Sequence, residues 1–202
     1  EALTEAEILD LIERFGHAAE VAKETGFTGV QIHAAHGYLL SQFLSPRANL
    51  RSDQWGGSLE NRARMLLAVV ARVRAGVGAA FPIGVKLNSA DFQRGGFAFE
   101  DSMVVARWLQ DAGVDLLEIS GGSYEQPAMM DIAGMEAPDA PKVAASTAAR
   151  EAYFVDFAKT MRASLTMPLL VTGGFRTRRA MNMALETGGA DVIGLGRPLC
   201  VD

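Results

Sequence analysis

The chain alternates between stretches with helical hydrophobic spacing and short, continuous apolar runs. The first helical stretch opens with Thr4 and Glu7, which form a T-x-x-E capping box. Apolar residues then recur every three or four positions from Ile8 to Ala22, and Gly26 ends the stretch. This spacing predicts an N-terminal helix with one apolar face.

Short apolar runs, each closed by polar residues or by glycine, recur after this helix. Such runs are typical of parallel strands that are buried on both faces. The predicted strands are GVQIH (29–33), FPIGVKLN (81–88), DLLEIS (115–120), MPLLVTGG (167–174) and DVIGLGRP (191–198).

Helical spacing fills most of the intervals between these strands. We predict a loop from Gly37 to Gly57 and then a helix with Ser58 as its N-cap. Further helices are predicted over 100–112, from about Thr147 to Ser164, and over 177–187. Regular alternation of strand and helix indicates right-handed βαβ units and a parallel sheet. Two architectures satisfy this pattern, a (β/α)8 barrel and an open doubly wound sheet.

The carboxyl ends of the predicted strands favour the barrel, because polar residues or glycines collect there. The ends are His33, Lys86 with Asn88, Ser120 to Gly122, Thr172 to Gly174, and Gly196 with Arg197. In a parallel barrel these ends share one face, which is where such folds build active sites. We therefore predict an α/β fold in which residues 1–202 form a single domain of the TIM barrel type.

Composition narrows the range of partners. The formal net charge of −5 argues against nucleic acid or an anionic membrane as a partner. No apolar segment is long enough to cross a membrane. Cys200 is the single cysteine, so no disulfide can form within the chain, which fits a cytoplasmic protein. The chain starts with Glu1 rather than Met and stops just after an apolar run, so we expect it to be part of a longer protein.

Two glycine-containing strand ends predict a phosphate site. Gly173 and Gly174 precede the predicted helix over 177–187, and Gly196 with Arg197 ends the next strand. Glycines let backbone N–H groups approach an anion, a helix N-terminus attracts it, and arginine can add a charged contact. The alternative is that these glycines only make tight turns between strand and helix.

His33, His36 and Tyr38 form the second candidate site. Core packing is one explanation, although two histidines beside a tyrosine suit a core poorly. Zinc is another, but a site needs at least three protein ligands and only His17 and Cys200 could add soft ones. The third explanation, which we favour, is a polar pocket without metal. Two imidazoles can donate to one substrate oxygen, and a phenol can deliver a proton.

Lys86 lies within an apolar strand. Its side chain either extends outward to solvent or points into the mouth of the barrel. In the second position its ammonium group would face negative charge that develops during a reaction.

The stretch IHAAHGYLLSQFLSPRANLRSDQWGGSLENRAR (32–64), followed by VKLN, EISGG, VTGGF and IGLGRP, resembles the old yellow enzyme family. These proteins are FMN-dependent NADH:flavin oxidoreductases and ene-reductases. The resemblance covers essentially the whole chain. It implies a (β/α)8 barrel with FMN at its carboxyl mouth, of which this chain supplies only strands four to eight. It also implies hydride transfer from NADH or NADPH, through flavin N5, to an activated alkene such as an enone, enoate or nitroalkene, or to a similar acceptor.

The resemblance also implies roles for single residues. His33 and His36 match the pair that hydrogen-bonds the substrate oxygen, a pair in which some members carry Asn at the second position. Tyr38 matches the tyrosine that protonates the α-carbon. Lys86 matches the basic residue beside flavin N1 and O2.

The phosphate-binding positions of the family match Gly174, Gly196 and Arg197, with Phe175 alongside. The residue-level argument adds Gly173 to this group. No metal is expected in either site.

Two other functions stay open on the sequence alone. One is a non-flavin, phosphate-binding barrel enzyme that uses Lys86 or Glu118 chemically. The other is an inactive half-barrel that acts as an assembly module through its two open sheet edges. For the leading function we expect a small-molecule substrate, and a homo-oligomer is compatible with the sequence.

Overall fold

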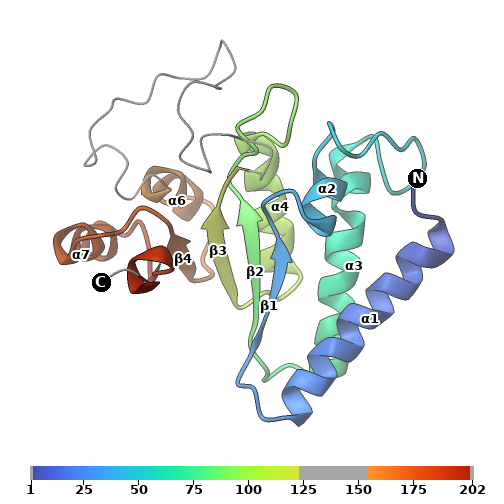
Figure 1. The fold of residues 1–202 in the computed structure, drawn as a ribbon, viewed down its shortest axis with the longest axis horizontal. Helices are drawn as coiled ribbons and strands as arrows, with labels where there is room; N and C mark the ends of the chain where they lie inside the picture. The colour runs from blue at the N-terminus through green and yellow to red at the C-terminus, as the bar shows by residue number, and fades with distance from the viewer. Residues whose placement is uncertain (1, 123–153, 201–202) are drawn as a thin grey trace.

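The structure is a computed structural model that describes residues 2–122 and 154–200, without the side chains of residues 197 and 198. Its centre is a five-stranded sheet (Figure 1). The strands are β1 (Val30–Ala34), β2 (Ile83–Asn88), β3 (Leu116–Ser120), β4 (Leu169–Thr172) and β5 (Val192–Gly194).

All neighbouring strands run parallel, and their order in the sheet is β1-β2-β3-β4-β5. The predicted parallel α/β fold is therefore confirmed. The order follows the chain without reversal, whereas a doubly wound sheet reverses its strand order at a switch point.

The helices precede, connect and follow these strands. They are α1 (Glu5–Glu24), α2 (Leu39–Leu44), α3 (Leu59–Val77), α4 (Phe99–Asp111), α6 (Val155–Arg162), α7 (Arg178–Glu186) and the 3-10 helix η2 (Arg197–Cys200). None of the helices in the described residues combines the length and the apolar character of a membrane span.

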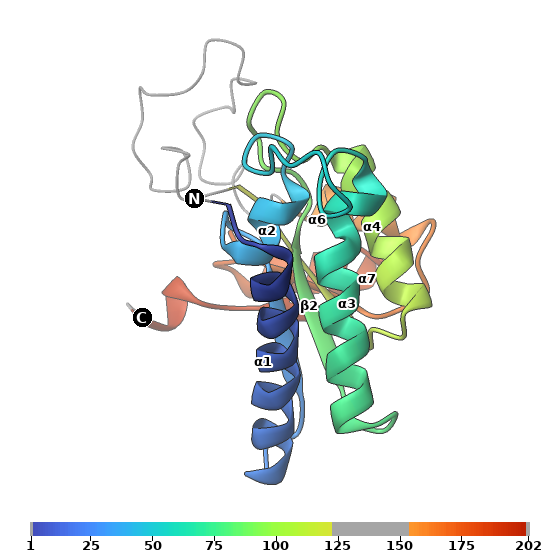
Figure 2. The ribbon, with the colours of Figure 1, turned by 90° about the vertical axis from the view of Figure 1, so that its right-hand side faces the viewer.

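The two predicted N-caps are both present. The Thr4 hydroxyl accepts from the backbone N–H of Glu7, and the Glu7 carboxylate accepts from the N–H of Thr4, which completes the capping box. The Ser58 hydroxyl accepts from the N–H of Asn61 at the start of α3. Helix α1 then packs along α3 (Figure 2).

The two faces of the sheet differ in character. Alternate strand residues such as Ile32, Val85 and Leu117 are buried in the core with the helices. In Figure 2, α3 and α4 lie together on one side of β2. The opposite face carries the registered row His33, Lys86 and Glu118, because partners on parallel strands point to the same side.

Helix α2 is a difference from prediction, because it interrupts the loop expected from Gly37 to Gly57. Its Leu40, Phe43 and Leu44 are buried in the core, so tertiary packing forms this short helix. Beyond it the chain is irregular, and Asn49 holds it by donating to the carbonyls of Phe43 and Trp55.

The C-terminal strand is shorter than the predicted 191–198. It ends at Gly194, and η2 begins at Arg197. The neighbouring strand β4 ends at Thr172, which pairs with Gly194, so the ladder has no further partner beyond that residue. The helix expected from about Thr147 to Ser164 is described only in its second part, as α6, and residues 147–153 lie outside the described residues.

Candidate functional site

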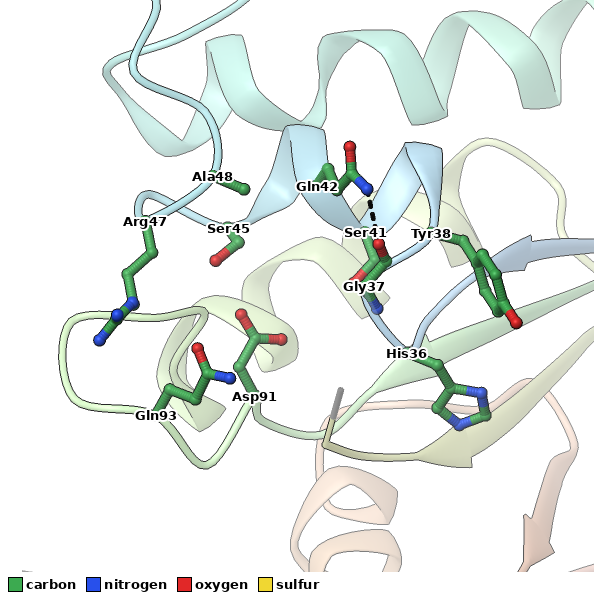
Figure 3. A pocket seen from close by; sticks show the side chains of 10 residues that line it. All are labelled: His36, Gly37, Tyr38, Ser41, Gln42, Ser45, Arg47, Ala48, Asp91 and Gln93. Carbon is green, nitrogen blue, oxygen red and sulfur yellow. Dashed lines mark hydrogen bonds between the residues drawn. The ribbon is translucent and has the colours of Figure 1, made fainter. Parts of the chain in front are cut away.

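The carboxyl end of β1 brings three aromatic donors together. His33 is in β1, His36 is in the turn after it, and Tyr38 is the N-cap residue of α2. The ring centroid of His33 lies 5.3 Å from that of His36 and 5.0 Å from that of Tyr38. In Figure 3 the side chains of His36 and Tyr38 project on the same side of the turn. We call these three residues the donor cluster.

The backbone of His36 has an unusual conformation for a residue other than glycine. Its φ is 63°, in the left-handed region, and Gly37 follows with a φ of 78°. The left-handed region favours glycine, and Asn, Asp and His are enriched among the other residues found there. A tight turn of this kind places two imidazoles three residues apart at one strand end.

Asn88 holds this turn in place from the end of β2. Its Oδ1 accepts from the backbone N–H of His36 at 3.2 Å. Its Nδ2 donates to Asp91 Oδ1 and to the carbonyl of Gly122. Asn88 is buried, and hydrogen bonds to His36, Asp91 and Gly122 fix the position of its side-chain amide.

The ring of His36 is held separately, from the end of β3. Its Nε2 lies 2.6 Å from the hydroxyl oxygen of Ser120, which is buried. The sequence marked Asn88 and Ser120 as polar strand ends but assigned neither of them a partner.

Both histidines of the donor cluster are held in the neutral form. Burial lowers the pKa of His36 to about 4, and the charge of Lys86 and repulsion from His33 when that ring is protonated add to this effect. Burial also lowers the pKa of His33, with a further contribution from Lys86. A neutral imidazole has one N–H donor and one acceptor nitrogen, so near neutral pH each ring can donate one hydrogen bond.

Acidification should therefore destabilise the fold through His36. Its pKa is about 4 in the folded chain, against 6.5 for an unperturbed histidine. Between these values the unfolded chain binds more protons, so the free energy of unfolding falls as the pH drops. The urea midpoint should decrease between about pH 7 and about pH 5, and we expect this decrease to be larger for the wild type than for His36→Asn. Asparagine tolerates the same backbone and does not titrate, so an equal fall in both would contradict the assignment.

Lys86 lies on the same face of the sheet as His33, in an ion pair. Its Nζ is 2.9 Å from Glu118 Oε1, and the two side chains are 19% and 8% exposed. Burial raises the pKa of Glu118, but hydrogen bonds from Thr172, Lys86 and Gln31 outweigh it and leave the pKa below its usual value. From the sequence, Glu118 was a candidate only for a chemical role as a base. In the structure it is the counter-ion of Lys86.

The predicted phosphate residues lie where β4 and β5 end. Gly173 and Gly174 have φ values of 122° and 77° and lead into α7, whose N-cap Thr177 accepts from the N–H of Ala180. The side chain of Phe175 is buried in the core, so only its backbone remains for a ligand at this turn.

The other half of the phosphate prediction follows β5, which pairs with β4 up to Thr172 and Gly194. A side chain built at Gly196 would meet no atom within 4 Å, so the space beside it is open. Arg197 begins η2, but its side chain lies outside the described part of the structure.

A cavity of about 350 Å³ opens beside the donor cluster (Figure 3). It lies between the segment around α2 and the loop that follows β2, and its lining includes Ser45, Arg47, Asp91 and Gln93. Arg47 crosses between the two segments by donating to the carbonyl of Arg94. Polar side chains from both segments therefore line the cavity.

The partners that the sequence missed share one pattern. Lys86 and Asn88 are two residues apart in β2, and Glu118 and Ser120 are two residues apart in β3. Side chains two apart in a strand face the same side, so this spacing could have indicated a common polar face. Among the described residues there is no group of three His, Cys, Asp or Glu side chains that could hold a metal ion.

Parallel strands in chain order, with imidazole, phenol and ammonium groups at their carboxyl ends, define an α/β protein of the kind that builds small-molecule sites on that edge. The chain belongs to the NADH:flavin oxidoreductase / NADH oxidase family, whose family model matches residues 1–202. The resemblance to the old yellow enzyme family is thereby confirmed.

Individual relatives agree with this assignment. The chain is 42% identical over 201 residues to the NADH-dependent flavin oxidoreductase iccE of Talaromyces variabilis, covering 99% of this chain and 47% of the relative. A structure of 2-naphthoyl-CoA reductase with 2-naphthoyl-CoA matches all of this chain and 29% of its own, with a TM-score of 0.88 and 31% identity. The old yellow enzyme homologue from Zymomonas mobilis matches 98% of this chain and 50% of its own, with a TM-score of 0.74 and 30% identity. The chain spans about half the length of the iccE protein.

Proposed function

We propose that the whole protein is an FMN-dependent oxidoreductase that passes hydride from NADH or NADPH, through the flavin, to a small activated alkene. Enones, enoates and nitroalkenes are the acceptor class. The observation that carries this proposal is the donor cluster, in which two neutral imidazoles and a phenol lie close together. The proposal also includes a cytoplasmic location, which the lack of disulfide-forming cysteine pairs supports.

We further propose that this chain supplies strands four to eight of a (β/α)8 barrel. The chain-order parallel sheet supports this, because successive strands of such a barrel lie side by side. The exposed position of Gln31 on β1 supports it as well, since a closed barrel would enclose that face.

The residues on this chain fit FMN in two places. The open space at Gly196 and the left-handed backbone at Gly173 and Gly174 suit a phosphate group, with Phe175 contributing its backbone and Arg197 its charge. Lys86 suits the polar edge of the flavin ring. When bound, FMN would supply the two-electron hydride chemistry that no side chain of this chain can perform.

The donor cluster accounts for what the acceptor needs. Hydride addition to an activated alkene moves negative charge onto its carbonyl or nitro oxygen. His33 and His36 would donate hydrogen bonds to that oxygen and so stabilise the transition state more than the bound substrate. Tyr38 would then donate its phenolic proton to the carbon that carries the remaining electron pair.

The alternative of a barrel enzyme that uses a Schiff-base lysine is disfavoured by one contact. A nucleophilic lysine must present its amine to the substrate carbonyl. Lys86 Nζ is instead held in an ion pair, 2.9 Å from the Glu118 carboxylate.

A flavin-retention experiment tests the proposal. We expect the whole protein, incubated with FMN and then desalted, to keep a visible flavin spectrum that NADH or NADPH bleaches under anaerobic conditions. Absence of retained flavin in the whole protein would overturn the proposed function.

A matched pair of variants locates the phosphate group. Gly196→Asp places a carboxylate in the open space, and Gly196→Asn places a neutral group of nearly the same size there. We expect the aspartate variant to bind FMN about tenfold or more weakly than the asparagine variant, because like charges repel. Equal affinity, measured by fluorescence titration, would exclude a phosphate at this position.

A further inference from the structure

The contact between His36 and Ser120 decides which nitrogen of the His36 ring carries the proton. A neutral imidazole protonated on one nitrogen can donate only from that nitrogen. The ring must therefore be in one of its two tautomers to stabilise charge on a substrate oxygen. The Ser120 hydroxyl lies 2.6 Å from Nε2, so if it donates to that nitrogen, the ring proton is carried by Nδ1.

Ser120 has few choices for its own proton. The residue is only 5% exposed, and a buried hydroxyl donor needs an acceptor. Among the described residues, this hydroxyl has one hydrogen-bond partner, His36 Nε2. An O–H that donates to Nε2 requires that nitrogen to be unprotonated.

Both partners of this contact are fixed by other bonds, so the contact is set by the fold. The carbonyl of Ser120 accepts from the backbone N–H of Ser89, which joins the ends of β2 and β3. The backbone N–H of His36 donates to the buried Asn88. The left-handed turn at His36 thus places its ring against Ser120, and backbone hydrogen bonds hold both segments at the end of β2.

We propose that Ser120 is a positioning residue that donates its hydroxyl proton to His36 Nε2 and thereby holds the His36 proton on Nδ1, ready to be donated to the substrate oxygen. The donation to substrate rests on the proposed function, whereas the tautomer does not. Ser120 itself touches no reacting atom in this proposal. The low pKa of His36 is consistent with it, because the ring stays neutral and its tautomer remains meaningful near neutral pH.

The experiment is nitrogen NMR of the whole protein labelled with ¹⁵N-histidine. Two-bond ¹H–¹⁵N spectra distinguish the Nδ1–H tautomer from the Nε2–H tautomer, and His36→Asn assigns the His36 signals. We expect Nδ1–H for His36 in the wild type. His17, which is exposed on α1, provides a second histidine signal for comparison.

Two variants test the role of the hydroxyl. In Ser120→Ala, His36 should be a mixture of tautomers or be in the Nε2–H form. The kcat for alkene reduction should fall about tenfold, because the substrate oxygen loses an aligned donor. Ser120→Thr keeps the hydroxyl and should restore both the tautomer and most of kcat. A merely structural role would leave the tautomer of the folded alanine variant unchanged.

The outcomes separate this inference from the proposed function. If the wild type reduces an alkene but His36 is in the Nε2–H form, the inference is wrong and the function stands. If His36 is in the Nδ1–H form and shifts in the alanine variant, the positioning role of Ser120 holds even in a protein that retains no flavin. The wild-type spectrum alone can overturn the inference, so it does not depend on the variants folding.

Discussion

Tyr38→Phe should slow reduction of an activated alkene by about 10² to 10⁴-fold, because it removes the proton donor. Reduction of the bound flavin by NADH or NADPH should be nearly unchanged, because that step needs no proton from Tyr38. The substitution keeps the ring, and therefore the 5.0 Å packing against His33.

The same substitution should leave the fold intact. Tyr38 is 46% exposed and makes no side-chain cap bond at the start of α2. Stopped-flow absorbance of the flavin separates the two half-reactions, and thermal unfolding of the variant provides the control. Equal losses in both half-reactions would show that Tyr38 acts on flavin or nicotinamide binding instead of proton transfer.

Lys86→Met should destabilise the folded chain by about 3 kcal/mol, because it leaves the carboxylate of Glu118 buried without its cation. Removal of one partner of a buried ion pair costs about 3–5 kcal/mol. We expect the lower end, because Thr172 and Gln31 still donate to Glu118 and Lys86 is 19% exposed. Urea unfolding near neutral pH provides the measurement.

The double variant Lys86→Met/Glu118→Gln is the matched control. The amide has nearly the shape of the carboxylate but no charge, so it should recover much of the lost stability. If the single and double variants unfold at the same urea concentration, the loss comes from packing of the lysine stem and not from the unpaired charge.

The fold was largely predictable, because its signals are local. The capping box at Thr4 and the N-cap at Ser58 mark helix starts within a few residues, and alternation of strand and helix determines a parallel sheet. Helix α2 carried no such signal. It is six residues long, lacks a side-chain cap and forms because Leu40 and Phe43 are buried by distant segments.

The site was predictable as a list of residues but not as a set of contacts. His33, His36 and Tyr38 stood out because two imidazoles and a phenol lie within six residues of one another, and Lys86 stood out because it lies within an apolar strand. Their partners depend on strand register, which places Lys86 opposite Glu118 although they are far apart in the chain. Register is set by the whole sheet, so a local pattern cannot supply it.

The left-handed backbone at His36 has a consequence for protein engineering. For a residue with a β-carbon, this left-handed conformation is less stable by about 1–2 kcal/mol, and the difference is larger for a β-branched residue. A saturation library at this position would therefore enrich glycine, asparagine and aspartate for reasons of foldability alone. Inactive library members with valine or isoleucine would reflect backbone strain. His36→Asn and His36→Gly both tolerate this backbone, and asparagine keeps a side-chain donor that glycine lacks. The comparison of these two variants therefore reveals what a donor at this position contributes to catalysis.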